Sequence, residues 1–159
     1  MSPRAACRLE TLGFSEVFDY VAGKHDWLAR GLPTQGETLP PVARDVTRDD
    51  VVTCGLADRV ADARARVDRS PHGFALVLSG TGVVLGRLRR STLDAAADAR
   101  AGDVMEAGPS TVRLDSDLGS LVERMQKRDL AYAIVTTPDG ELAGILRRTD
   151  AEARLGQST

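Results

Sequence analysis

The chain is poor in the residues that stabilise small secreted proteins and metal-binding proteins. Its 159 residues include two cysteines, Cys7 and Cys54, and two histidines, His25 and His72. Two cysteines are too few for a disulfide framework, and no pair among these four side chains has the spacing of a zinc site. We therefore expect neither a disulfide-rich fold nor a structural metal, and we expect a reducing, cytoplasmic location.

A strong excess of one charge and long apolar segments are also missing. The formal net charge is −2, so no basic field attracts nucleic acid or an anionic membrane surface. Apolar runs extend over only a few residues, whereas a membrane-spanning helix needs about 20. Arg4 and Arg8 interrupt the beginning of the chain and no apolar segment follows, which argues against a signal peptide. We expect one or two small globular domains without a nucleic-acid or membrane partner.

An internal repeat organises most of the chain. Shifted by 58 residues, the sequence aligns with itself without a gap, so that Asp45 falls on Asp103 and Gly86 on Gly144. Other identical pairs are Ala43/Ala101, Val46/Val104, Leu56/Leu114, Arg66/Arg124, Ala75/Ala133, Val77/Val135, Gly82/Gly140, Leu88/Leu146, Arg89/Arg147, Arg90/Arg148 and Ala95/Ala153. A period of this length with matching turn residues indicates two copies of one supersecondary unit.

The second copy shows what this unit is. After the short extended segment "STVRL", apolar side chains follow the spacing of a helix at Leu118, Leu121, Val122 and Met125. Asp115 or Ser116 is the expected N-cap of that helix. "AYAIVTT" predicts a strand, "PDG" a turn, "ELAGIL" a return strand and "RRTDAEARL" a second helix. We therefore predict an α/β (α+β) fold of two β-α-β-turn-β-α units packed through their apolar sheet faces.

The glycine-rich stretch "SGTGVVLGRLRRS" has some of the features of a phosphate-binding loop. Its third glycine, Gly86, comes one residue too late for the G-x-G-x-x-G pattern. The repeat aligns Gly82 with Gly140 of the "PDG" turn. We therefore expect a hairpin turn and a return strand here instead of a nucleotide loop.

Residues 43–155 resemble a tandem pair of CBS domains. "AGDVMEAGPSTVRLDSDLGSLVERM" is similar to the opening of that repeat, and "LAYAIVTTPDGELAGILRRTD" is similar to its hairpin and the segment that follows. The resemblance implies two βαββα repeats in a pseudo-two-fold disc, with a cleft on each side of the shared interface. Such pairs are regulatory modules that commonly form homodimers and often bind adenosine-containing ligands.

The resemblance also identifies candidate ligand residues. In ligand-binding members the return strand carries Gly, two apolar residues, Ser or Thr, two further residues and Asp. Here Gly144 and Asp150 match, whereas Arg147 replaces the hydroxyl residue, and the first copy has Arg89 and Thr92 in place of the hydroxyl and the aspartate. This implies AMP, ADP, ATP or another adenosyl ligand in the second cleft only. Asp150 would bind the ribose, and Arg147 a phosphate.

Five residues of the first copy complete the predicted cleft: Asp45, Val46, His72, Gly73 and Phe74. Explanations without a ligand stay open for several of these side chains. Asp150 and Asp45 could cap helix ends, and His72 could be a solvated loop residue.

Residues 2–36 belong to neither copy and look like the last third of a rhodanese domain. The matching residues are Ser2, Ala5, Ala6, Leu9, Gly13, Phe14, Val17, Gly23, Trp27, Gly31 and Pro33. We expect a helix over residues 2–12, a short strand over residues 17–20 and a turn anchored by Trp27. The rhodanese nucleophile is a cysteine in a loop before this helix, whereas Cys7 lies within it, which disfavours sulfur transfer.

The sequence thus predicts an arm over residues 1–36, a linker over residues 37–42, and repeats over residues 43–100 and 101–159. The leading hypothesis is a non-catalytic regulatory protein that forms homodimers and senses an adenine nucleotide. The alternative is a protein-interaction module with empty clefts, and a rhodanese-like sulfurtransferase is the third hypothesis.

Overall fold

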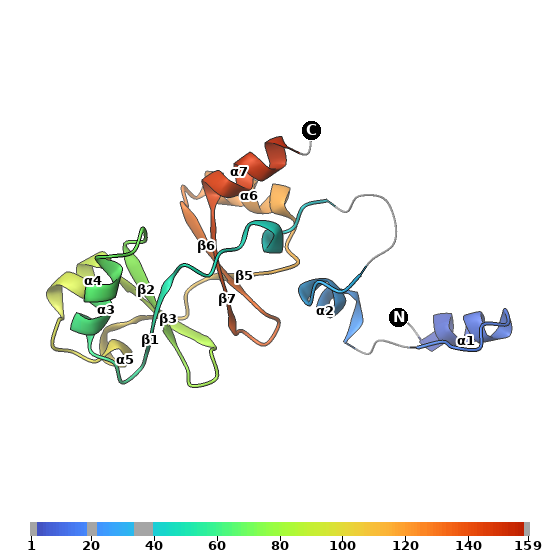
Figure 1. The fold of residues 1–159 in the computed structure, drawn as a ribbon, viewed down its shortest axis with the longest axis horizontal. Helices are drawn as coiled ribbons and strands as arrows, with labels where there is room; N and C mark the ends of the chain where they lie inside the picture. The colour runs from blue at the N-terminus through green and yellow to red at the C-terminus, as the bar shows by residue number, and fades with distance from the viewer. Residues whose placement is uncertain (1–2, 19–21, 34–39, 158–159) are drawn as a thin grey trace. The chain divides into compact units, whose positions relative to one another are not determined.

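The computed structural model describes residues 3–18, 22–33 and 40–157 and separates the chain into two units, Met1–Glu37 and Thr38–Thr159 (Figure 1). The first unit contains the helices α1 (Pro3–Thr11) and α2 (Gly23–Ala29). The strand expected at residues 17–20 is not formed at Val17 and Phe18, and the rest of that segment lies outside the described residues. Trp27 lies in α2, and its indole N–H donates to the carbonyl oxygen of Pro33 at 3.0 Å.

The second unit consists of the two predicted repeats. The first contains the 3-10 helix η1 (Ala43–Val46), β1 (Val52–Gly55), α3 (Val60–Val67), β2 (Phe74–Leu78), β3 (Val84–Arg89) and α4 (Arg90–Ala95). The second contains α5 (Ala101–Val104), β4 (Glu106–Ala107), β5 (Thr111–Arg113), α6 (Leu118–Lys127), β6 (Tyr132–Thr136), β7 (Leu142–Arg147) and α7 (Arg148–Gly156). The predicted fold class is confirmed.

The strand register repeats with the sequence. β1 pairs in parallel with β2 and β2 antiparallel with β3, and β5, β6 and β7 pair in the same way. Phe74 is opposite Arg89, as Tyr132 is opposite Arg147, and both hairpins shift register at equivalent points, after Val77 and Val135. The sequence repeat is therefore a structural repeat down to individual residue pairs.

The glycine-rich stretch forms the first hairpin turn. Ser79 N–H donates to the carbonyl oxygen of Val83 at 2.9 Å, and Gly82 has φ 84°, a left-handed conformation that favours glycine. The two hairpins contact each other, since Val84 N–H donates to the carbonyl oxygen of Gly140 and Leu142 N–H to that of Gly82. β3 follows the turn directly, where a phosphate loop would require a helix.

Helix α6 is capped one or two residues later than expected. Asp117, and not Asp115 or Ser116, is its N-cap, and Asp117 Oδ1 accepts a hydrogen bond from Ser120 N–H at 2.8 Å. Hydrogen bonding from Ser120, first of all from its backbone N–H, lowers the pKa of Asp117.

The short segments that lead into the repeats, residues 43–48 and 101–106, are exchanged between the folded halves. Ala43 N–H donates to Ser116 O at 2.9 Å, and in the equivalent place Ala101 N–H donates to Asp58 O at 2.8 Å. We call β1, α3, β2, β3, α4, α5 and β4 the first half, and η1, β5, α6, β6, β7 and α7 the second half. Each half thus contains the leading segment of the other repeat.

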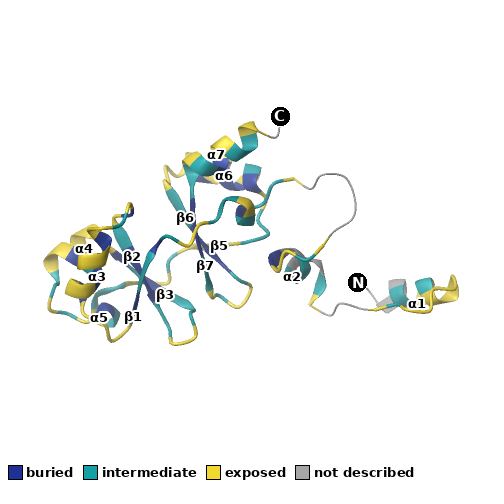
Figure 2. Ribbon diagram, viewed as in Figure 1, coloured by how far each residue is buried: buried dark blue, intermediate teal, exposed yellow. Residues whose placement is uncertain are grey.

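Three apolar clusters hold the second unit together (Figure 2). Ala101 is fully buried in the core of the first half, and Ala43 is fully buried in that of the second. The third cluster joins the two sheets through Val51, Leu76, Ile134 and Ile145. The sheets therefore bury their apolar faces against each other, and polar side chains at the margin of this interface come close together.

Candidate functional site between the two repeats

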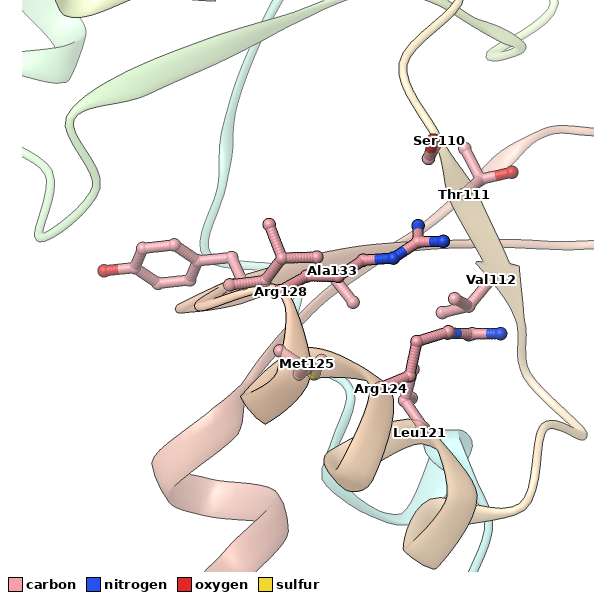
Figure 3. A pocket seen from close by; sticks show the side chains of 10 residues that line it. Ser110, Thr111, Val112, Leu121, Arg124, Met125, Arg128 and Ala133 are labelled. Carbon is pink, nitrogen blue, oxygen red and sulfur yellow. The ribbon is translucent and has the colours of Figure 1, made fainter.

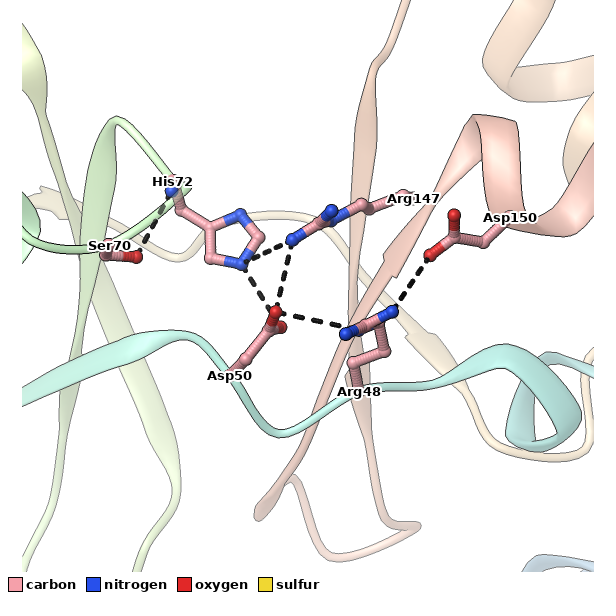
Figure 4. Close-up of polar contacts among 6 residues, drawn as sticks. All are labelled: Arg48, Asp50, Ser70, His72, Arg147 and Asp150. Atoms are coloured by element: carbon pink, nitrogen blue, oxygen red, sulfur yellow. Dashed lines mark hydrogen bonds and ion pairs between the residues drawn. The ribbon is translucent and has the colours of Figure 1, made fainter.

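Five polar side chains meet at the margin of the interface between the two halves: Arg48, Asp50, His72, Arg147 and Asp150 (Figure 4). We call them the inter-repeat cluster. Arg147 Nη2 lies 3.1 Å from Asp50 Oδ2, and His72 Nε2 lies 3.1 Å from Asp50 Oδ1. Arg48 reaches both carboxylates, at 3.5 Å to Asp50 and 3.8 Å to Asp150. The cluster therefore connects residues on both sides of the interface.

Backbone pairing places Arg48 in the cluster. The N–H and the carbonyl of Arg48 both pair with Ile145 of β7, at 2.8 Å each. The neighbouring Gly144 has φ 146°, and a Cβ at this position would overlap the carbonyl group of Arg48. Glycine is therefore required here because the leading segment passes directly over the strand.

His72 is held in a conflicting hydrogen-bonding environment. Its side chain is fully buried before β2, and Nε2 lies 3.1 Å from an acceptor on Asp50 but 3.4 Å from the guanidinium of Arg147. A ring nitrogen either donates or accepts a hydrogen bond, so Nε2 can satisfy Asp50 or Arg147 but not both at once. The phenol and phenyl rings of Tyr132 and Phe74 pack against the imidazole, with centroids 5.5 and 6.0 Å away.

The positive charges of the cluster set the protonation of Asp50. Burial alone would raise the pKa of Asp50, but the hydrogen bond and charge of His72 and the charges of Arg147 and Arg48 hold it below its usual value. Asp50 is therefore ionised over the whole physiological range. The carboxylates of Asp50 and Asp150 lie against the guanidinium groups of Arg147 and Arg48.

Three polar atoms of the cluster are buried without a hydrogen bond: His72 Nδ1, Arg147 Nε and Asp150 Oδ2. Buried polar atoms in folded proteins are normally hydrogen-bonded to protein, water or ligand. The inter-repeat cluster therefore has unused hydrogen-bonding capacity at the position where both repeats meet.

The structure brings some of the sequence-predicted site residues together. Arg147, Asp150 and His72 belong to the cluster. Gly144 leaves room for the backbone of Arg48, and the ring of Phe74 packs against His72. Gly73 lies between His72 and Phe74 and has open space on its side-chain face.

Two predicted residues have other contacts. Asp45 Oδ2 accepts a hydrogen bond from Val42 N–H at 3.0 Å and so closes the first turn of η1. Val46 packs against the core of the second half. The contact of Asp45 in the structure is therefore a helix-capping contact, one of the explanations without a ligand.

Two of the explanations without a ligand are wrong. α7 begins at Arg148, with Arg147 in the N-cap position, so Asp150 is the third residue of the helix and not its cap. His72 is buried rather than solvated. Both side chains face the other repeat because β7 and its following helix meet the loop before β2.

Sequence reasoning missed Arg48 and Asp50. In the repeat alignment they stand opposite Glu106 and Gly108, so no identity marks them. The available signal was "RDD" (residues 48–50), a run of charge immediately before the buried Val51. Charged residues next to a buried strand often lie at the margin of a core, where they find partners.

The equivalent place in the first half has a different charge arrangement. Glu106 lies 2.8 Å from Arg87 and 2.7 Å from Arg89, and Thr92 occupies the position of Asp150. Hydrogen bonds from Arg89 and Arg87 lower the pKa of Glu106 to about 2. Both arginines are therefore occupied by one carboxylate on this side of the molecule.

Comparison with known proteins identifies the repeat. The family model of the CBS domain matches residues 101–155, and the first repeat has the same strand order and register. The chain carries a tandem CBS-domain pair. It is similar to the CBS domains of a transcriptional regulator from Streptococcus pneumoniae, with a TM-score of 0.64, 20% identity, and 71% of this chain and 98% of that chain covered.

Two further proteins contain regions that are similar to this CBS pair. CBSX2, solved in complex with AMP, matches with a TM-score of 0.64 and 18% identity, covering 74% of this chain and 98% of that chain. The GMP reductase of Mycobacterium tuberculosis is 30% identical over 122 residues, which are 76% of this chain and 25% of the enzyme. The chain thus spans about a quarter of the length of that curated relative.

The described residues contain neither a metal-binding group of side chains nor a membrane-spanning helix. Within residues 3–18, 22–33 and 40–157, no three metal-ligating side chains are grouped so that they could hold an ion. None of the helices in these ranges has the length and apolar character needed to cross a bilayer.

Proposed function

We propose that this CBS pair is a regulatory module that binds an adenine nucleotide at the inter-repeat cluster. The observation that carries the proposal is the convergence of Arg147 and Asp150 with His72, Asp50 and Arg48 across the repeat interface. The protein regulates through this site because a ligand bound between two halves changes how they pack against each other.

Each charged side chain has a role suited to a nucleotide. The carboxylate of Asp150 is the acceptor for the two ribose hydroxyls, as the family resemblance implies. Arg147 and Arg48 present planar guanidinium groups, which bind phosphate through two parallel hydrogen bonds. The AMP complex of the similar CBSX2 supports a ligand of this class.

In the structure the cluster is closed, so binding requires a rearrangement. Arg48 lies across Asp150 at 3.8 Å, but its side chain is 53% exposed and can swing into solvent. Its departure frees the Asp150 carboxylate for ribose and leaves a guanidinium available for phosphate. A nucleotide thus replaces an internal ion pair with its own contacts.

A specific observation also favours the interaction module without a ligand. Both arginines of the cluster already have carboxylate partners, and the ion pairs of Arg48 with Asp150 and of Arg147 with Asp50 join residues of the two repeats. In this second candidate function the cluster fixes the arrangement of the halves, and the module acts by binding another protein.

Thermal stability with nucleotides separates the two candidates. AMP, ADP, ATP, adenosine and GMP, the nucleotide in the relatives' name, are each added to the full chain. If the nucleotide proposal is right, at least one raises the melting temperature, and Asp150→Asn or Arg147→Gln abolishes the rise. Arg113→Gln, an exposed substitution on β5 outside the cluster, is the matched control and keeps it. If no nucleotide changes the melting temperature, the interaction module is the better explanation.

The proposal includes a homodimer, as is common for CBS pairs, with residues 1–36 as an assembly arm. Leu12, Phe14 and Phe18 in this arm are exposed large apolar side chains, which suits contact with a partner. Sedimentation of the full chain and of a form lacking residues 1–38 tests both parts. A monomeric full chain contradicts the dimer, and an unchanged dimer after truncation contradicts the role of the arm.

A further inference from the structure

A groove of about 220 Å³ lies within the second half, between α6 and the strands β5 and β6 (Figure 3). Its floor is apolar and is formed by Val112, Leu121, Met125 and Ala133. Leu121 and Met125 are buried, whereas Leu130 at the edge is 43% exposed. Apolar surface that remains open to water in this way gains free energy when a ligand covers it.

Two arginines line the same groove. Arg124 belongs to the last turn of α6, and Arg128 is the C-cap residue of that helix. Figure 3 shows both guanidinium groups reaching toward β5, the strand that carries Thr111 and Val112. Within the part of the chain that the structure describes, neither has an ion-pair partner. Two like charges four residues apart on a helix repel each other, so a bound anion would relieve this repulsion.

The first repeat provides an internal comparison. There Arg66, which the repeat alignment places on Arg124, lies 3.8 Å from Asp58. The position equivalent to Asp58 is Ser116, which has no charge. The second repeat thus lacks, at this position, the carboxylate that pairs with the equivalent arginine of the first repeat. A cation in the last turn of α6 interacts favourably with the helix dipole. This interaction explains the positive charge of Arg124, but it does not explain why the side chain lies over an apolar groove.

The size of the groove limits what it can hold. A cavity of about 150 Å³ accommodates benzene, whereas pockets for drug-sized ligands measure about 300–1,000 Å³. The present groove therefore suits one aromatic ring with a short polar group and is too small for a whole nucleotide. The hydroxyl groups of Ser110 and Thr111, both lining residues, can donate hydrogen bonds to the same polar group.

We infer that this groove binds a small aromatic carboxylate, with the ring on the apolar floor and the carboxylate between Arg124 and Arg128. The site is distinct from the inter-repeat cluster, because all of its lining residues belong to the second repeat. Tyr132 connects the two places, since it lines the groove and packs edge-on against His72 of the cluster. A ligand in the groove therefore acts on the packing of the cluster through this ring.

Phenylacetate, with 2-phenylethanol as its uncharged analogue, tests the proposal by NMR titration of the full chain. Phenylacetate should shift the amide signals of β5 and α6, and 2-phenylethanol should bind about tenfold more weakly or worse. Arg124→Gln with Arg128→Gln should weaken phenylacetate binding to the level of the alcohol. Higher salt should also weaken it, because salt screens the charges.

Lys127→Gln is the matched control, since Lys127 lies on the same helix but outside the groove, 4.0 Å from Glu123. It should leave the affinity for phenylacetate unchanged. Equal binding of acid and alcohol, equal effects of the lysine and arginine variants, or no shifts at millimolar phenylacetate would each overturn the proposal. Displacement of phenylacetate by AMP in the Asp150→Asn variant would also overturn it, since it would make the groove part of a nucleotide site.

Discussion

Gly144 shows how one residue decides whether the inter-repeat cluster can form. The leading segment crosses β7 so closely that Arg48 and Ile145 exchange two backbone hydrogen bonds beside it. A side chain on Gly144 would enter the carbonyl group of Arg48, and its φ of 146° is outside the range that other residues readily adopt. The position of the Arg48 guanidinium therefore depends on the absence of a neighbouring Cβ.

Gly144→Ala is expected to lower the free energy of unfolding by about 3 kcal/mol, because backbone strain and overpacking add. Urea denaturation measures the change. Gly119→Ala in the first turn of α6 is the control, where a Cβ would make only ordinary contact and alanine favours the helix. A Gly144→Ala protein as stable as the wild type would show that the leading segment can move away without cost.

Glu106 is an exposed carboxyl group whose titration is strongly altered. Its pKa in the folded protein is about 2, below the ordinary value of 4.5, because it accepts hydrogen bonds from Arg89 and Arg87. A lowered pKa contributes stability that is fully present above pH 4.5 and is lost as the pH falls toward 2. Since the group is exposed, solvent screening makes this contribution small.

The melting temperatures of wild type and Glu106→Gln should therefore differ at neutral pH and converge between pH 4.5 and 2. The wild type should be the more stable protein at neutral pH. Glu141→Gln, in the exposed turn of the second hairpin, should show no such convergence. A difference between wild type and Glu106→Gln that is constant with pH would contradict the ion cluster.

At the scale of single elements, packing determines which face of α6 is buried, and capping determines where the helix begins. The apolar stripe of Leu118, Leu121 and Met125 is buried and selects the face of the helix. It does not select the first residue of the helix, because several polar residues precede it. In the structure the N-cap is Asp117, whose carboxylate accepts a hydrogen bond from Ser120 N–H.

Asp117→Ala should lower the free energy of unfolding by about 1 kcal/mol, the usual cost of losing an N-cap. Ser116→Ala, one of the two caps that the sequence suggests, should have little effect because its side chain has no capping role. Chemical denaturation of the two variants in parallel measures this difference. Equal losses would show that the cap lies elsewhere.

At the scale of the whole molecule, neither sequence repeat is a complete folding unit. Ala43 is fully buried in the core of the second half, and Ala101 in that of the first. Removing a leading segment therefore opens a core and leaves the backbone groups of the other half without partners.

A fragment of residues 101–159, which contains the match to the CBS family model, is therefore expected to be unfolded by circular dichroism. Adding a fragment of residues 38–100 should restore structure, because it supplies Ala43, whose N–H donates to Ser116 O, and Arg44, whose N–H donates to Leu114 O. Native-like structure and a cooperative thermal transition in the isolated 101–159 fragment would contradict the exchange.

Much of the fold follows from the sequence because it depends on local patterns. The 58-residue period predicts two equal units, and the spacing of apolar residues with "PDG" predicts the order of helices, strands and turns. The same patterns locate Arg147 and Asp150 at the end of a strand and the start of a helix. Such features need only neighbours in the chain.

The partners of these side chains were decided by the tertiary structure alone. Arg48 and Asp50 are not repeated in the second copy, where Glu106 and Gly108 stand, and they reach Asp150 and Arg147 only because the leading segments are exchanged. The burial of His72 likewise depends on rings from both repeats. Contacts between residues far apart in the chain follow from how two sheets pack, which local periodicity does not encode. The sequence by itself therefore determined the two CBS units, and their packing determined the site between them.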